Sequence, residues 1–340
     1  MSKRRLLLPL VPLYAAVVAA KNALYATSLL HPKQLTWPVV SVGNLSTGGA
    51  GKTPFVLALH HLVAAAGWHA DVLTRGYGRR EGGIVQADPT GTAAQFGDEP
   101  LLLARAGLGV YVGADRYRAG LLVEQQLPSA NTLHILDDGM QHRKLARQIE
   151  IVLLLQADFA DHLLPAGNLR EPLSALRRAD IIVLREEEAP ALEIKARKLL
   201  GPDRKPLFWR IHRALRFTTM EGTPTAAPKR PLAFCAVARP QSFHALLRLN
   251  GCEPVAHVDF PDHHLYTMRD IKALLGRAFE FGADSFVTTA KDACKLQPDM
   301  LAALTQIAPV VIAELVTTIL DAPTATAQLA ELLARNSSSA

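Results

Sequence analysis

The sequence has few cysteines and lacks any spacing typical of a zinc site. Three cysteines, Cys235, Cys252 and Cys294, occur among 340 residues, and none belongs to a C-x-x-C pair. An odd number of widely spaced cysteines is typical of reduced thiols in a cytosolic protein. We therefore expect no disulfide and no structural metal.

Aromatic residues are also scarce, at 6% of the chain, whereas basic residues are in excess. The net charge of +6 favours an anionic partner: nucleic acid, an acidic membrane surface or a phosphorylated substrate. Arginines and lysines are scattered over many segments, and no basic strip is interleaved with aromatics, so the sequence argues against nucleic acid. With 49% hydrophobic residues, the chain is long enough for two domains.

A glycine-rich bend between an apolar strand and a Lys-Thr pair predicts a phosphate-binding P-loop at residues 39–54. The usual pattern is G-x-x-x-x-G-K-[ST], and Ser46 replaces its first glycine. The N–H groups of the bend and the positive end of the next helix would attract phosphates, Lys52 would reach the β- and γ-phosphates, and Thr53 would ligate Mg²⁺. The alternative interpretation is a plain glycine turn before a helix. It explains the preceding strand and the following Gly-Lys-Thr less well than a P-loop does. The predicted nucleotide-binding residues are Ser46, Thr47, Gly48, Gly49, Ala50, Gly51, Lys52 and Thr53.

An apolar strand that ends in two carboxylates is the second strong signal. Residues 132–136 are followed by Asp137 and Asp138, and P-loop enzymes hold the Mg²⁺ of the nucleotide with such an aspartate. A turn after a strand also favours Asp and Gly for local reasons. Together with the P-loop, the pair predicts a magnesium site.

Strands alternate with helices along the rest of the chain. Expected strands cover residues 70–74, 150–155, 180–184, 208–212, 232–237, 255–260, 285–289 and 310–313, and expected helices cover 54–66 and 268–281. This alternation predicts an α/β fold with a doubly wound, mostly parallel sheet joined by right-handed crossovers. A Thr/Pro/Ala-rich stretch after residue 212 suits a linker to a second, smaller α/β unit.

Several polar loops follow expected strands, where open α/β sheets place their ligands. Arg75 begins a basic loop, and Asp98 and Glu99 are adjacent carboxylates at a helix start. That pair serves either as an N-cap or as a general base and metal contact. The segments 260–264, with two histidines, and 288–292 could line a cleft between domains.

The N-terminus carries a short apolar run. Lys3-Arg4-Arg5 precedes an uncharged stretch from Leu6 to Ala20, which Lys21 ends. Fifteen residues with two prolines are too short for a comfortable membrane span, and a nucleotide site directly afterwards argues against a secretory signal peptide. Of the remaining readings, a helix packed on the domain and a helix in the headgroup plane, we favour the second, because Tyr14, Tyr25 and the flanking bases suit an interface.

Seven segments, taken in order, resemble one family. "SVGNLSTGGAGKTP", "LTRGYG", "GDEPLLLAR", "DDGMQH", "LPAGNLREPLSAL", "FPDHH" and "VTTAKDACKL" are similar to motifs of the bacterial tetraacyldisaccharide 4'-kinases, which phosphorylate a lipid A precursor with ATP at the cytoplasmic face of the inner membrane. Ser46 and Ala50 fall at variable places of the family loop. Ala290 stands where we expect an acidic residue, which counts against a direct role for this segment but not against the family.

The resemblance implies a P-loop-type kinase domain at 31–206, a two-stranded linker at 207–230, a smaller C-terminal domain at 231–340 and a membrane-surface helix within 1–30. It implies ATP and Mg²⁺ as cofactors, a tetraacyldisaccharide 1-phosphate as acceptor, and an anionic membrane surface as partner; we expect a monomer. By resemblance Asp98 is the base and His263 its partner, with either His263 or His264 facing the site. The remaining implied contacts are Lys52 with phosphate, Thr53, Asp137, Asp138 and Glu99 near the metal, and Arg75, His142 and Arg170 with substrate.

A different class stays open at this point. The string "TGGAGKT" is also similar to the loop of membrane-recruited partitioning ATPases, which are switches, but those carry a lysine where this chain has Thr47.

Overall fold

A computed structural model describes residues 3–79, 82–126 and 131–337. Its strands are β1 (Val39–Asn44), β2 (His69–Thr74), β3 (Val85–Gln86), β4 (Gly109–Val112), β5 (Thr132–Asp137), β6 (Ile149–Leu153), β7 (Ile181–Arg185), β8 (Leu207–Thr218), β9 (Pro231–Cys235), β10 (Ala256–Asp259), β11 (Ser285–Thr289) and β12 (Val310–Ile319). These strands form one sheet in the order β10-β9-β11-β12-β8-β7-β6-β1-β5-β2-β4-β3. Most neighbours are parallel, as the alternation of strands and helices predicts.

Helices connect the strands. The 3₁₀ helix η1 (Lys3–Leu10) leads into α1 (Val11–Ala26), and the others are α2 (Lys52–Ala65), α3 (Ala93–Phe96), α4 (Asp98–Arg105), α5 (Arg116–Gln126), η2 (Gln156–Ala160), η3 (Leu173–Arg178), α6 (Ala189–Leu200), α7 (Pro240–Leu249), α8 (Met268–Phe281), α9 (Ala290–Ala293), α10 (Pro298–Thr305) and α11 (Ala322–Ser337). Each expected strand and helix is present to within a few residues, except that β8 and β12 extend well beyond their expected ends.

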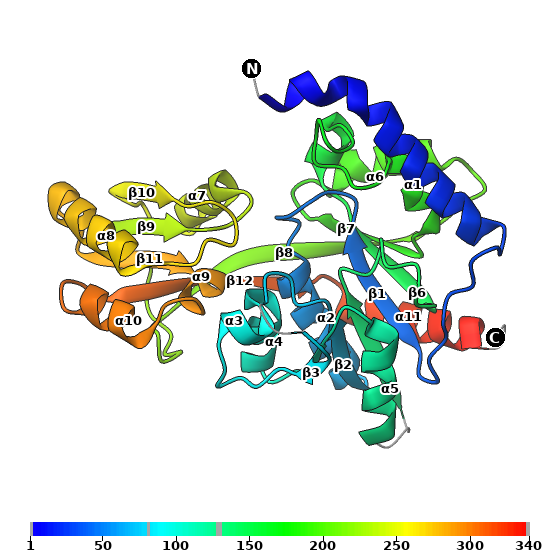
Figure 1. Ribbon diagram of the computed structural model, residues 1–340, viewed down its shortest axis with the longest axis horizontal. Coiled ribbons are helices and arrows are strands. Elements are labelled where there is room, and N and C mark those ends of the chain that lie inside the picture. The colour runs from blue at the N-terminus through cyan, green and yellow to red at the C-terminus, as the bar shows by residue number, and fades with distance from the viewer. Residues whose placement is uncertain (1–2, 80–81, 127–130, 338–340) are drawn as a thin grey trace.

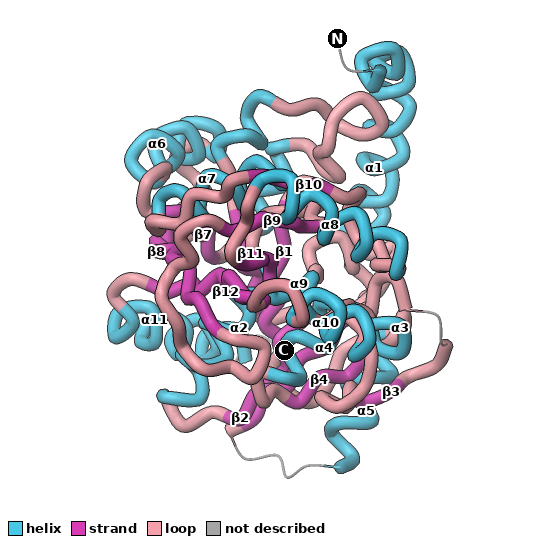
Figure 2. Tube along the Cα trace, turned by 90° about the vertical axis from the view of Figure 1, so that its left-hand side faces the viewer, coloured by secondary structure: helices cyan, strands magenta, loops and turns pink. Residues whose placement is uncertain are grey.

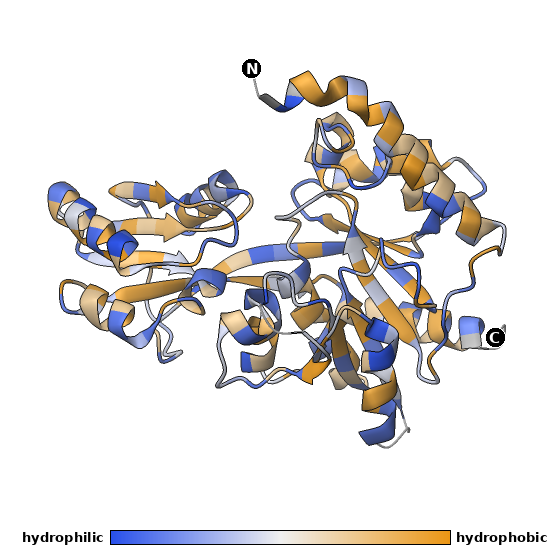
Figure 3. Ribbon diagram, in the orientation of Figure 1, coloured by the Kyte–Doolittle hydropathy of each residue, from blue (hydrophilic) through white to orange (hydrophobic). Residues whose placement is uncertain are grey.

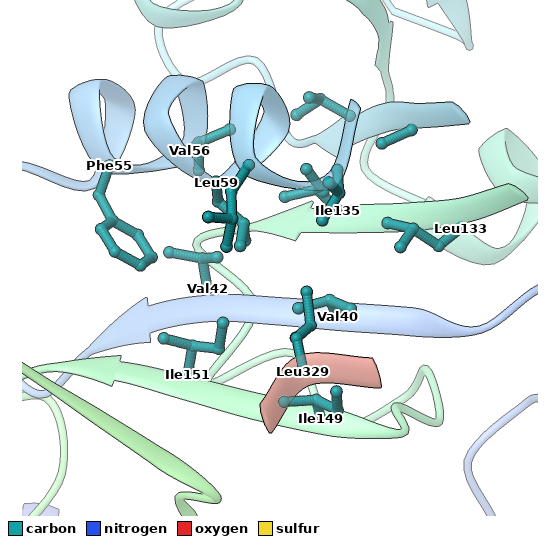
Figure 4. Close-up of a cluster of buried hydrophobic side chains, with 14 of the residues drawn as sticks. Val40, Val42, Phe55, Val56, Leu59, Leu133, Ile135, Ile149, Ile151 and Leu329 are labelled. Carbon is teal, nitrogen blue, oxygen red and sulfur yellow. The ribbon is translucent and has the colours of Figure 1, made fainter. Parts of the chain in front are cut away.

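The larger lobe is built around β1, which lies between β5 and β6. All six residues of β1 are buried because helices cover both faces of the sheet, as in parallel α/β sheets generally. On one face, Phe55 and Leu59 of α2 point toward Val42 and Ile135 of the strands (Figure 4). Each such fully buried side chain contributes about 1.5–3 kcal/mol. This packing fixes the start of α2, and with it the P-loop, against the carboxyl ends of β1 and β5.

Two long strands join the lobes. The first half of β8 pairs with β7 of the larger lobe, the first half of β12 pairs with β11 of the smaller lobe, and β8 and β12 pair antiparallel with each other (Figure 1). The expected linker at 207–230 therefore contained only one of the two strands. Its partner comes from residues 310–319, because the chain enters the smaller lobe on β8 and leaves it on β12.

The C-terminal helix also differs from expectation. The range 231–340 was assigned to the smaller domain, but α11 packs with α2, and Leu329, Leu332 and Leu333 belong to the core of the larger lobe. In Figure 1 the chain crosses back along β12 and ends beside the larger lobe. That assignment was wrong for α11. The chain returns to the larger lobe along β12 before α11 begins, and the apolar side of α11 packs against α2 there.

The N-terminal helix stands on the outside of the larger lobe, as two views at right angles show (Figures 1 and 2). Its outer surface is largely hydrophobic (Figure 3), and Leu6, Leu13 and Val17 are 82%, 67% and 62% exposed. Helical structure continues past Lys21 to Ala26, and Lys21 Nζ donates to the Gln141 carbonyl at 3.0 Å. The apolar helix Leu6–Ala26 therefore has 21 residues and is long enough to span a membrane by length and composition. The fifteen-residue estimate was too short.

Candidate active site

The P-loop has the backbone conformation that its glycines predict. Gly48, Gly49 and Gly51 have φ of 60°, 66° and 85°, a region that favours glycine. The smaller lobe lies directly on this loop, since a Cβ added to Gly48 would come within 2.6 Å of Ala238 and one added to Gly49 within 2.9 Å of Arg239. Both lobes therefore contribute to the phosphate region.

Lys52 lies in a cluster of polar groups at the ends of β1 and β5. Its Nζ donates to Asn44 Oδ1 at 2.9 Å and lies 3.2 Å from Asp138 Oδ1. Arg170 donates to both oxygens of Asp138 at 2.8 Å and to Asn44 Oδ1 at 2.8 Å. Burial favours the neutral form of Asp138, but these cations outweigh it and hold the Asp138 pKa below its ordinary value. Asp138 is thus a carboxylate already satisfied by two cations.

Asp137 is in the opposite situation. Thr74 Oγ1 donates to its Oδ2 at 3.1 Å, while its buried Oδ1 has no hydrogen-bond partner among the described residues. Burial and the nearby charges of Glu99 and Asp138 raise the pKa of Asp137 to about 7. A buried, unpartnered carboxylate oxygen beside further oxygen donors is a setting that suits Mg²⁺. Thr53 and Glu99, both expected near the metal, line the adjoining cavity.

Asp98 and His263 meet across the two lobes. His263 Nδ1 lies 3.0 Å from Asp98 Oδ2, and the ring of Tyr77 packs on the imidazole with centroids 4.9 Å apart. Burial alone would raise the pKa of Asp98, but His263, Lys291 and Lys295 lower it to about 2. The expected pairing of these two residues is therefore present, with Asp98 held as a carboxylate.

Lys291 connects this pair to the rest of the cavity. Its Nζ lies 3.1 Å from Glu99 Oε1, 3.3 Å from His263 Nε2 and 3.6 Å from Asp98 Oδ2. The departure from the family pattern at Ala290 counted against a direct role for this segment. The structure corrects this, since the neighbouring Lys291 points into the Asp98 and His263 contact.

The adjacent histidines face different ways. His264 Nε2 lies 3.0 Å from Asp270 Oδ2 in the capping region of α8, and its ring stacks on Phe260. His263 is therefore the histidine that lies in the cleft, and its backbone adopts φ of 60° to place it there.

A third group of polar residues surrounds Arg116, which sequence reasoning missed. Arg116 is 7% exposed, forms no ion pair with a carboxylate in the described ranges, and has a buried Nε without a partner. Burial and the charge of Arg75 lower the pKa of Arg116 to about 10. His142 is close to Arg116, and burial and the charge of Arg116 lower its pKa to about 3, so its ring is neutral at pH 7. Arg75 and His142 thus lie close to Arg116, and Asp138 is near this group.

A cavity of about 250 Å³ lies between the lobes, and the P-loop, Glu99, His263 and Lys291 are among the residues that line it. The P-loop lines one side, and apolar side chains of the smaller lobe and linker, including Val237, Leu246 and Leu315, line the other. A phosphate cradle beside an apolar chamber matches the shape of a nucleotide, with its charged and its aromatic ends.

Sequence reasoning placed most of these groups and missed four. Three of the four lie inside recognised motifs and Arg116 lies outside them, but the part of each in the site appears only when strands meet. The missed residues are Asn44, Arg116, Lys291 and Lys295.

Comparisons with known proteins agree with this geometry. The family model described as tetraacyldisaccharide-1-P 4'-kinase matches residues 3–334. The tetraacyldisaccharide 4'-kinase of Koribacter versatilis is 44% identical over 296 residues, covering 85% of this chain and 88% of that one, and the enzyme of Aquifex aeolicus is 37% identical over 304 residues, covering 86% and 90%. The crystal structure of "apo" form LpxK from Aquifex aeolicus in complex with ATP superposes with a TM-score of 0.75 at 30% identity, covering 97% of this chain and 99% of that one. On these matches, the chain belongs to the tetraacyldisaccharide-1-phosphate 4'-kinase family.

Proposed function

We propose that this protein transfers the γ-phosphate of ATP to the 4'-hydroxyl of a tetraacyldisaccharide 1-phosphate. The observation that carries the proposal is the 3.0 Å contact between His263 of the smaller lobe and Asp98 of the larger lobe, at the edge of the P-loop cavity. A partitioning ATPase switch has no need of a base for an acceptor hydroxyl, whereas a kinase does.

In the proposed reaction the acceptor O–H bond breaks and its proton passes to Asp98. The oxygen forms a bond to the γ-phosphorus while the bond from phosphorus to the β–γ bridging oxygen breaks, and ADP leaves. His263 orients Asp98 through Nδ1 and is itself held by Tyr77 and Lys291. The P-loop N–H groups and Lys52 neutralise charge on the transferred phosphoryl group, which is the main demand of a loose transition state.

Asp137, Thr53 and Glu99 are the residues proposed to hold Mg²⁺. The unpartnered Oδ1 of Asp137 supports this assignment, and Asp138 acts instead as the partner of Lys52 and Arg170. When bound, Mg²⁺ would offset the charge of the β- and γ-phosphates.

Arg116, Arg75 and His142 are proposed to receive an anionic group of the acceptor. A buried guanidinium without a carboxylate partner is costly unless a ligand supplies the opposite charge. The neutral ring of His142 adds a hydrogen-bonding group without adding charge.

We further propose that α1 holds the protein on the cytoplasmic face of an anionic membrane. Its exposed leucines and its adjoining bases Lys21 and Arg143 support this orientation. Tyr14 of α1 donates to the Arg170 carbonyl at 3.0 Å, so the protein-facing side of the helix lies next to the site.

The test is transfer of labelled γ-phosphate to tetraacyldisaccharide 1-phosphate in mixed anionic vesicles. Label should appear on the acceptor at its 4' position, and ATP turnover should rise with acceptor but not with DNA. Equal ATP turnover with and without acceptor, and no labelled lipid, would contradict the proposal and favour an ATPase switch.

A further inference from the structure

Three metal-binding side chains meet in the smaller lobe, away from the P-loop. Cys235 ends β9, Asp259 ends the neighbouring strand β10, and His244 lies on α7 above them. Cys235 and Asp259 are register partners in the β9 and β10 pair, so the sheet itself sets them side by side. Eight residues separate the first two ligands along the chain and fourteen the last two, which is why no short zinc motif appears in the sequence.

The donor atoms have the spacing of a tetrahedral site. His244 Nε2 lies 2.9 Å from Asp259 Oδ1, Cys235 Sγ lies 3.6 Å from the same oxygen, and all three donors lie within 4.8 Å of one another. Around a tetrahedral zinc ion, the nitrogen and oxygen donors would be about 3.4 Å apart and the sulfur and oxygen donors about 3.6 Å apart. The two distances that involve Asp259 Oδ1 lie within about half an ångström of these values.

Charge and burial favour a cation at this place. Cys235 is fully buried and His244 is 6% exposed, while Asp259 is exposed and opens one side to solvent. Asp259 forms no ion pair with a lysine or arginine within residues 3–79, 82–126 and 131–337. His257 stacks on His244 with ring centroids 4.0 Å apart, and its buried Nδ1 has no partner in the same ranges. A carboxylate without a lysine or arginine partner is therefore one of the three donors, and an imidazole nitrogen without a partner lies beside them.

We propose that Cys235, His244 and Asp259 bind one Zn²⁺, with a water at the open fourth position. A thiolate, an imidazole and a carboxylate form a donor set that prefers zinc over magnesium, whereas the oxygen donors near the P-loop have the opposite preference. The expectation of no structural metal rested on sequence spacing alone, and the fold supplies the missing proximity.

The zinc ion would stiffen one wall of the nucleotide cavity. Phe243 and Leu246 on either side of His244 line that cavity, and Ala238 and Arg239, shortly after Cys235, lie on the P-loop glycines. Tying α7 to the ends of β9 and β10 fixes the part of the smaller lobe that meets the P-loop.

The test uses Co²⁺ as a spectroscopic probe on the full-length protein after chelator treatment, with Mg²⁺ in excess. The wild type should bind about one Co²⁺ per chain, with tetrahedral d–d bands and a thiolate-to-cobalt charge-transfer band, and Zn²⁺ should displace it. Cys235→Ser should lose the charge-transfer band. Asp259→Asn, which keeps the shape of the side chain, should weaken binding at least tenfold, the lower range seen even for outer-shell partners.

Cys252→Ala is the matched control, because Cys252 is buried in the same hydrophobic cluster and lies in no group of metal-binding side chains in the described chain. The Co²⁺ spectrum of Cys252→Ala should equal that of the wild type. Zn²⁺ should raise the Tm of the wild type and of Cys252→Ala, but not the Tm of Asp259→Asn. No charge-transfer band in the wild type would overturn the proposal and leave an ordinary His244 and Asp259 hydrogen bond. A band that persists in Cys235→Ser, or depends on Cys294, would also overturn it.

Discussion

Lys52 of the P-loop lies 3.2 Å from Asp138, the second carboxylate after β5. The lysine expected to reach the nucleotide thus contacts the carboxylate of Asp138, and Arg170 donates to both oxygens of that carboxylate. The ammonium group has three N–H donors, and Asn44 and Asp138 take two of them, so one remains for a phosphate oxygen.

Lys52→Ala should abolish transfer with little effect on folding. The substitution removes the charge at the phosphates but no core contact, so Tm should change by no more than a few degrees. Phosphate transfer and thermal unfolding are measured together, with the exposed Lys198→Ala as control. More than a tenth of the wild-type rate in Lys52→Ala would contradict the P-loop assignment.

Asp137→Asn and Asp138→Asn should differ in their response to Mg²⁺. Asp137 has the unpartnered oxygen, so its substitution should raise the Mg²⁺ concentration for half-maximal rate, and high Mg²⁺ should restore part of the activity. Asp138→Asn should lower the rate without that shift, because its oxygens already bind Lys52 and Arg170. The reverse pattern would exchange the two roles.

Lys291→Met should move the acid limb of the kcat/KM profile to higher pH. The wild-type Asp98 pKa is about 2, partly because Lys291 favours the ionised form. Removing that cation should raise the Asp98 pKa by about one unit or more. Since the folded pKa lies below its ordinary value of 3.8, ionised Asp98 also stabilises the fold above about pH 4, and this is lost as pH falls toward 2. An identical acid limb in Lys291→Met and Lys291→Arg would refute the coupling.

A triple variant with serine in place of Leu6, Leu13 and Val17 should bind anionic vesicles less tightly than the wild type. It should also transfer less phosphate to acceptor held in vesicles. Each side chain is more than 60% exposed, so the fold should persist. Point substitutions are cleaner than deleting residues 1–20, which would also remove the contact from Tyr14 to Arg170. Transfer to detergent-dispersed acceptor serves as control and should be nearly unchanged. Equal vesicle binding by both proteins would reject the membrane role of α1.

Local patterns predicted most of the site's backbone. The P-loop glycines, the strand before Asp137 and the short polar loops at strand ends are read from adjacent residues, and all lie where expected. The pairing of Asp98 with His263 came from family resemblance, since no local pattern relates residues 165 positions apart. His264 could be set aside only when its contacts with Asp270 and Phe260 were seen.

The remaining features of the site and the fold depend on tertiary packing. Lys291 and Arg116 are single charged residues whose partners, or lack of partners, depend on strands that meet only in the fold. The return of α11 to the larger lobe has the same cause, because its apolar side fits a surface formed by α2, far earlier in the chain.

The most direct test of this account is a double-mutant cycle on Asp98 and His263 in the transfer assay. Asp98→Ala and His263→Ala should each reduce turnover by about 10²–10⁴-fold, the usual scale for a general base, and the double variant should be little worse than either. His264→Ala, whose ring lies against Phe260, should lose much less. Losses that multiply in the double variant, or a larger loss from His264→Ala than from His263→Ala, would contradict the claim that the two lobes meet to form one catalytic pair.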